Sequence, residues 1–188
     1  LRAEAGLVFD LGWPPVQLNP EMPAGGVDRR AYRTEKFGSW EKSLELDARV
    51  ADAGRAAGLA FRHDLMARTP NTVEAHRLVK LAGPAQHAVV DRLFRAYFQE
   101  GQDIGDAATL ATLGAEAGMA EDGLAAFGDS DAVREEVMAE SLGLSQAGIS
   151  GVPSFLLDRH FLFSGAMPAD RMADGLRRAV AILRSRAA

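Results

Sequence analysis

The pattern of apolar residues changes abruptly near Ile149, and this change restricts the fold more than any other feature of the chain. Between residues 28 and 147, apolar positions recur every three or four residues, as they do along one face of a helix. Residues 154–157 and 160–164 are short apolar runs bounded by turn residues, which is typical of strands. Residues 7–13 form a similar run before two prolines. The sequence therefore predicts an α/β fold in which a long helical segment is inserted between strands.

We place the domain boundaries before residue 28, where the helical pattern begins, and after residue 147, where it ends. Residues 1–27 and 148–188 are expected to form one α/β domain, and residues 28–147 an all-α insertion. The segment 16–27 is rich in proline and glycine, so we expect a loop there.

Capping residues predict where several helices begin. Asp28, Ser39 and Asp106 each stand directly before a helical pattern, and their side-chain oxygens can accept a hydrogen bond from the first turn. Asn71 is followed three residues later by Glu74, a spacing in which the two side chains can satisfy two backbone N–H groups at a helix start. These positions predict four separate helices within the insertion.

Apolar side chains on one face of each helix are expected to form the core of the insertion. We assign to this core Trp40 with Leu44, together with the stripe of Phe94, Tyr97 and Phe98. The alternative is that such a stripe lines a nucleotide cofactor site, but no glycine-rich phosphate-binding motif follows a strand.

Composition excludes several classes of function. With 26 acidic and 21 basic residues the net charge is -5, which supplies no basic surface for nucleic acid or for an anionic membrane. No apolar run approaches the roughly 20 residues of a membrane-spanning helix. The absence of cysteine excludes disulfides, cysteine-ligated metals and a cysteine nucleophile among the 188 residues. The histidines are scattered without a metal-binding spacing, so we expect no metal site.

The segment Gly148-Ile-Ser-Gly-Val-Pro-Ser-Phe155 is the most specific local signal. A proline directly before an apolar strand cannot donate to the hydrogen bonds of a sheet, and its peptide bond can be cis. A cis Val152-Pro153 bond would turn the backbone N–H and C=O of Val152 outward, where an extended peptide could pair with them. The alternative is an ordinary trans proline at the start of an edge strand. Ser154 and Ser164 lack the G-x-S-x-G context of a serine hydrolase.

Other segments accompany this one in a fixed order along the chain. They are Pro15-Val-Gln-Leu-Asn-Pro20, Tyr32-Arg-Thr-Glu-Lys-Phe-Gly-Ser-Trp40, Thr69-Pro-Asn-Thr-Val-Glu-Ala-His-Arg-Leu78, Leu93-Phe-Arg-Ala-Tyr-Phe98, Gly101-Gln-Asp-Ile104 and Phe163-Ser-Gly-Ala166. Together with the segment around Pro153, they resemble the DsbA-like thioredoxin superfamily, specifically its FrnE-like oxidoreductases. These neighbour the 2-hydroxychromene-2-carboxylate isomerases and the kappa-class glutathione transferases. The resemblance covers essentially the whole chain.

The resemblance implies a thioredoxin-like fold with a large helical insertion, and a cis-proline loop at Val152-Pro153 opposite a catalytic thiol. In the family, the thiol belongs to a Cys-x-x-Cys motif at the N-terminus of the first helix, where the helix end lowers the cysteine pKa. The residues expected to contact substrate are Gly151, Val152, Pro153, Asn19, Asn71 and His76. Simple helix packing is the alternative for His76, and loop capping is the alternative for Asn19.

The first strand and the Cys-x-x-Cys motif of the family have no counterpart in the sequence, so we expect them upstream of Leu1 and no catalytic residue within the chain. The predicted function is thiol–disulfide exchange on a protein or small-molecule disulfide or thiol, without nucleic acid, membrane or bound cofactor. One alternative is a glutathione-dependent isomerase or transferase with serine in place of the first cysteine; another is a non-catalytic thioredoxin-like binding module. The resemblance favours the cytoplasm and leaves a homodimer open.

Overall fold

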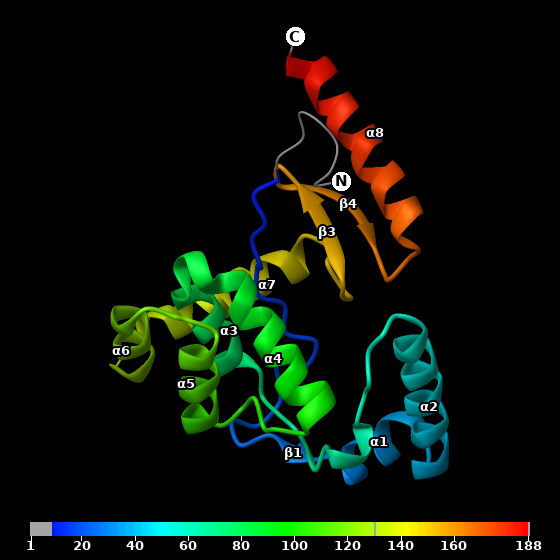
Figure 1. Ribbon diagram of the computed structural model, residues 1–188, viewed down its shortest axis with the longest axis vertical. Coiled ribbons are helices and arrows are strands. Elements are labelled where there is room, and N and C mark those ends of the chain that lie inside the picture. The colour runs from blue at the N-terminus through cyan, green and yellow to red at the C-terminus, as the bar shows by residue number, and fades with distance from the viewer. Residues whose placement is uncertain (1–8, 130, 188) are drawn as a thin grey trace. The chain divides into compact units, whose positions relative to one another are not determined.

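A computed structural model describes residues 9–129 and 131–187 of the chain (Figure 1). Its contacts divide the chain into two compact units. Gly12–Ser141 form what we call the helical unit, and Leu142–Ala188 with the described part of Leu1–Leu11 form the sheet unit. The helices are α1 (Arg29–Phe37), α2 (Trp40–Ala56), α3 (Val73–Leu81), α4 (Gln86–Glu100), α5 (Ala107–Glu116), α6 (Glu121–Asp129), α7 (Ala132–Gln146) and α8 (Ala169–Ala187). Short 3-10 turns lie at His63–Leu65 and Gly83–Ala85.

Three of the predicted helix caps are present. The side chains of Asp28, Ser39 and Asp106 accept hydrogen bonds from backbone N–H groups in the first turns of α1, α2 and α5. A helix that the sequence analysis did not predict, α6 (Glu121–Asp129), lies between α5 and α7. The capping side chains therefore set the start of α1, α2 and α5 as expected.

The predicted cap at Asn71 is wrong in its detail. The helix α3 begins at Val73 with Thr72 as the preceding residue, and the Asn71 side chain accepts from the Val73 N–H at 3.0 Å. The Glu74 carboxylate does not complete a reciprocal cap. It instead forms an ion pair with Arg134 of α7, at 2.6 Å, because a nearby cation is a stronger partner than a backbone N–H.

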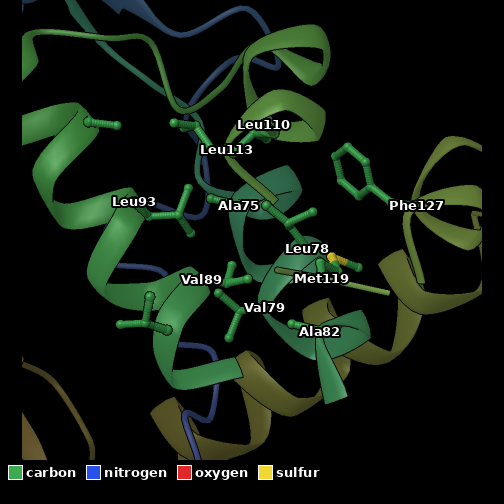
Figure 2. Packing of buried hydrophobic residues seen from close by; sticks show 12 residues of the cluster. Ala75, Leu78, Val79, Ala82, Val89, Leu93, Leu110, Leu113, Met119 and Phe127 are labelled. Carbon is green, nitrogen blue, oxygen red and sulfur yellow. The ribbon is translucent and has the colours of Figure 1, made fainter. Parts of the chain in front are cut away.

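The core of the helical unit lies between α3, α4, α5 and α6 (Figure 2). Leu78, Val89 and Leu110 are completely shielded from solvent, and Leu113, Met119 and Phe127 complete the centre of the cluster. Each of these helices buries one apolar face, which the periodicity predicted for α3, α4 and α5.

Two of the predicted core residues are exposed. Leu44 of α2 is 47% accessible and Phe94 of α4 is 54% accessible. The buried face of α2 carries Ser43 and Asp47 instead, since α1 presents charged side chains to it.

A buried ionic cluster joins α1 to α2. One carboxylate oxygen of Asp47 binds Arg29 at 2.7 Å, and the other binds Arg33 at 2.8 Å. The Arg33 Nε also donates to the Ser43 Oγ at 2.6 Å. The two arginines thus share one aspartate, and these contacts replace an apolar interface between the two helices.

The loop before α1 belongs to the helical unit, which differs from the predicted boundary between residues 27 and 28. The Trp13 N–H donates to Gln86 Oε1 at 3.2 Å, and the Gln17 N–H donates to Ser141 Oγ at 2.9 Å. Two short strands, β1 (Val27–Asp28) and β2 (Arg68–Thr69), pair antiparallel at its end. These hydrogen bonds account for the placement of the loop.

The strand predicted at residues 7–13 is not present in its described part. Residues 9–13 are irregular, and residues 7 and 8 lie outside the described residues. The Trp13 N–H is bound by the side chain of Gln86 and so is not available to a neighbouring strand.

The sheet unit contains the predicted hairpin. β3 (Ser154–Leu157) pairs antiparallel with β4 (His160–Ser164), and α8 follows in the chain (Figure 1). Asp158 and Arg159 form the connection, both with left-handed backbone conformations, φ 48° and 63°. Such a two-residue turn matches the twist of the strands and pairs Leu157 with His160, and the register then shifts between Phe155 and Leu156. No helix among the described residues has the length and apolarity to cross a membrane.

Candidate functional site

The loop between α7 and β3 is the centre of the candidate site. After the end of α7, the buried residue Ile149 donates its N–H to the Leu144 carbonyl at 3.0 Å. The Val152-Pro153 peptide bond is cis. The loop is therefore anchored at its beginning by Ile149 and at its end by β3.

The hairpin behind this loop has one face packed against α8. Phe155 and Phe163 are directly paired across the two strands, with their ring centroids 4.8 Å apart. Gly175 of α8 lies beside Phe163, so closely that an added Cβ would be 3.2 Å from its ring. This close approach holds the helix on the face that carries the two phenylalanines.

Val152 is the accessible point of the loop. Its side chain is 52% exposed, and neither its N–H nor its C=O has a hydrogen-bond partner among the described residues. The carbonyls on either side of it are bound within the unit; the Pro153 carbonyl, for example, accepts from the Gly165 N–H at 2.8 Å. Val152 can thus offer one donor and one acceptor to an extended chain, as in the addition of a strand.

Asn19 and Asn71 meet at Met22 in the helical unit. The Met22 N–H donates to the backbone carbonyl of Asn19 at 3.1 Å, and the Asn71 Nδ2 donates to the Met22 carbonyl at 2.6 Å. With its other end bound to Val73, the Asn71 amide links the loop to α3. These contacts give Asn71 a structural role, and its role in substrate binding stays a prediction.

His76 lies on α3 beside the same loop. Burial lowers the pKa of His76, and a hydrogen bond with the backbone of Val16 partly offsets this effect. The imidazole is therefore neutral near neutral pH, which agrees with the alternative that it packs against the loop. Its contact with substrate likewise stays a prediction.

The six predicted site residues thus fall into two groups. Gly151, Val152 and Pro153 are consecutive in the sheet unit, whereas Asn19, Asn71 and His76 border the loop of the helical unit. Within residues 9–129 and 131–187, no three histidine, aspartate or glutamate side chains are grouped as metal ligands.

Ser154 and Ser164 were considered from the sequence only as hydrolase nucleophiles, and no role beside the loop was predicted for them. They are paired in register across the hairpin, next to the loop. The two-residue turn at Asp158-Arg159 alone would place Ser154 opposite Phe163, and a shift in register between Phe155 and Leu156 places it opposite Ser164 instead.

A β-hairpin that follows a cis-proline loop and packs on a C-terminal helix, in a chain with a long helical insertion, defines a thioredoxin-like protein of the α/β class. The model of the DsbA-like thioredoxin domain matches residues 3–177. The chain belongs to this family, whose members are of the thiol–disulfide oxidoreductase type.

Solved structures agree with this assignment. The chain is similar to a probable DsbA oxidoreductase from Streptomyces coelicolor, with 29% identity and a TM-score of 0.76 over 87% of this chain and 72% of that one. It also resembles a candidate protein disulfide isomerase from Nitrosomonas europaea in fold, with 20% identity and a TM-score of 0.64 over 75% of this chain and 74% of that one. No curated protein matches the sequence.

Proposed function

We propose that the chain is a FrnE-like thiol–disulfide oxidoreductase in which the Gly151–Pro153 loop holds an extended segment of the substrate. The observation that carries this proposal is Val152, whose backbone N–H and C=O are free of partners among the described residues and whose side chain is half exposed. An accessible donor and acceptor on one extended residue are what a strand of substrate needs for pairing.

The chemistry of the family defines what this binding would serve. A thiolate attacks one sulfur of the substrate disulfide, the substrate S–S bond breaks, and a mixed disulfide forms as the other sulfur leaves as a thiolate. A second thiolate then releases the substrate. None of the 188 residues is a cysteine, so these residues supply the binding surface and not the attacking thiolate.

Peptide titration followed by NMR tests the proposal. The probe is a synthetic peptide of about ten residues with one S-methylated cysteine between β-branched residues, which favour an extended chain. We expect chemical-shift changes that are largest at the amides of Gly151, Val152 and Ser154. Changes confined to the helical unit, or no change at millimolar peptide, would show that the loop is not a substrate site.

Two further measurements separate the competing functions. The 188-residue chain should not accelerate the reduction of insulin by dithiothreitol, because it has no thiol. Acceleration by the cysteine-free chain would refute the oxidoreductase assignment. Titration with glutathione tests the isomerase or transferase alternative. That alternative predicts that glutathione binds beside Val152 and that the S-methylated peptide does not.

A further inference from the structure

We propose that Ser154 and Ser164 are positioning residues whose hydroxyl groups hold the backbone on both sides of Val152 in the geometry that binds substrate. This inference rests on the proposed function of the Gly151–Pro153 loop. It adds two residues that do not themselves contact substrate and that act through the carbonyls of Gly151 and Pro153, the residues on either side of Val152.

The two hydroxyls lie at the junction between the loop and the hairpin. The Ser154 Oγ donates to the Gly151 carbonyl at 2.7 Å, and the Ser164 Oγ donates to the Pro153 carbonyl at 3.3 Å. The two Oγ atoms are 3.2 Å apart. One hydroxyl therefore binds the carbonyl before Val152, the other binds the carbonyl after it, and the two hydroxyls contact each other.

Strand geometry explains why these side chains are available for this role. Successive side chains along a strand point to opposite faces of the sheet. Phe163 lies against α8 and Phe155 is paired with it, so the adjacent residues Ser154 and Ser164 point to the other face. The apolar packing of the hairpin and the hydrogen bonding of the loop thus use separate faces.

The consequence for binding is a reduced cost of ordering the loop. A loop that already has its bound conformation loses little conformational freedom when a ligand pairs with it. With the carbonyls of Gly151 and Pro153 occupied, the peptide groups of Val152 are oriented in advance and remain free for substrate. Without the hydroxyls, the Gly151 carbonyl would lose its partner and the Pro153 carbonyl would keep only the Gly165 N–H, so part of the loop would have to be ordered on binding.

A purely structural role is the competing explanation, because a cross-strand pair of serines also contributes to the stability of a hairpin. The two explanations differ in what they predict for affinity. At a temperature where the protein is fully folded, a modest loss of hairpin stability leaves the dissociation constant for a peptide unchanged. Loss of positioning raises it.

The test compares Ser164→Thr with Ser164→Val, two β-branched side chains of nearly the same shape of which only threonine keeps a hydroxyl. The same pair is made at Ser154. The matched control is Ser185→Ala, which removes a hydroxyl of α8 that donates to the Ile182 carbonyl at 2.8 Å. Each protein is titrated with the S-methylated peptide, and the exchange rate of the Gly165 amide, which donates to the Pro153 carbonyl, is measured by NMR.

We expect the valine variants to bind the peptide about three- to tenfold more weakly than the threonine variants, the effect of one lost hydrogen bond. The Gly165 amide should exchange faster in the valine variants only, and Ser185→Ala should bind like the unchanged chain. Equal affinity of the threonine and valine variants, with binding intact in the unchanged chain, would overturn the positioning role and leave the proposed function standing. Failure of the unchanged chain to bind the peptide at the loop would overturn both.

Discussion

In the helical unit Leu78, Val89 and Leu110 are completely shielded from solvent, whereas in the sheet unit Ile149 alone is buried among the residues whose burial is described. The hairpin of the sheet unit leaves Leu156 and Phe161 substantially exposed. A two-stranded hairpin with one helix offers few positions at which an apolar side chain can be surrounded on all sides. The helical unit has four helices around one apolar cluster, so many of its apolar side chains are surrounded on all sides.

This contrast concerns function as well as stability. Segments with few buried apolar contacts open more readily than a packed core, and binding loops are often found among them. The Gly151–Pro153 loop belongs to the sheet unit, which has few buried apolar side chains. Hydrogen bonds such as those of Ser154 and Ser164 therefore contribute more to fixing the backbone there than in the helical unit. The predictions below test how far the two units differ.

The largest expected effect is at Leu78. Leu78→Ala should lower the free energy of unfolding of the helical unit by about 3–5 kcal/mol, because the side chain is fully buried and its removal leaves a cavity. Both tryptophans of the chain, Trp13 and Trp40, lie in this unit, so their fluorescence in a urea titration follows its unfolding.

The control for this experiment is Leu156→Ala in β3, where the side chain is 38% exposed. We expect the tryptophan-detected midpoint to stay within error of that of the unchanged chain. An equal shift for both variants would mean that the two units unfold as one, and the contrast between them would then have no energetic meaning.

A somewhat smaller effect is expected at the ionic cluster of α1 and α2. Asp47→Ala should destabilise the helical unit by about 3 kcal/mol, because it leaves the buried Arg29 without its counter-ion. The value falls at the lower end of the range for broken buried pairs, since Arg33 is partly exposed and can turn toward water. Thermal unfolding followed by circular dichroism gives the measurement.

Asp52→Ala is the matched control, because Asp52 pairs with Arg55 on the exposed face of the same helix. Exposed pairs of this kind contribute less than about 1 kcal/mol, so the control should barely change the melting temperature. Similar losses for both aspartates would show that the cluster at Asp47 is not a buried contact.

These two sites also show what could be predicted from the sequence. Asp28, Ser39 and Asp106 were identified correctly because a helix cap depends only on neighbouring residues. Leu44 and Phe94 were assigned to the core incorrectly because periodicity identifies an apolar face without showing which element packs on it. The partners of Asp47 come from a different helix, which local patterns do not reveal.

The candidate site also contains some features that could be predicted from the sequence and others that could not. The hairpin after Pro153 could be predicted from local sequence, since short apolar runs and a two-residue turn have strong local preferences, whereas the cis bond at Val152-Pro153 was expected only from the family resemblance. The hydrogen bonds of Ser154 and Ser164 depend on the conformation of the loop that they bind, so the sequence alone did not indicate them.

Two glycines extend the comparison between a tightly packed unit and an open one. Gly101 follows α4 with φ 69°, and an added Cβ would lie 2.7 Å from the Leu65 carbonyl oxygen. Gly101→Ala should therefore cost about 2 kcal/mol, from the left-handed backbone and from the contact together.

Gly143 in α7 is the counterpart in the sheet unit, with nothing within 4 Å of an added Cβ. Gly143→Ala should be neutral or stabilise by up to about 1 kcal/mol, because alanine is the better helix former. The melting temperature should fall for Gly101→Ala and stay unchanged or rise for Gly143→Ala. A loss of stability for Gly143→Ala would indicate that α7 is more closely packed than the structure has it.

The smallest expected effect is the change in the free energy of unfolding with pH that arises from His76. This residue lies beside the loop that precedes α1. Because burial lowers the pKa of His76, the unfolded chain takes up a proton at a higher pH than the folded chain does. The resulting contribution to stability is fully present above about pH 6.5, the usual histidine pKa, and is lost as the pH falls toward the lowered folded value. His63 also has its pKa lowered, mainly by burial, so the pH profile of the unchanged chain combines both groups.

His76→Gln isolates the contribution of His76, since glutamine can still donate a hydrogen bond to the backbone of Val16 and cannot be protonated. The variant should lose less stability than the unchanged chain between about pH 6.5 and 5, measured by urea titration with tryptophan fluorescence. Trp13 makes the measurement specific, because it lies in the same loop, where its N–H donates to Gln86. Parallel pH profiles for the two proteins would mean that the His76 ring is open to water, and the loop would then be held to the helical unit by Trp13, Gln17 and Met22 without the histidine.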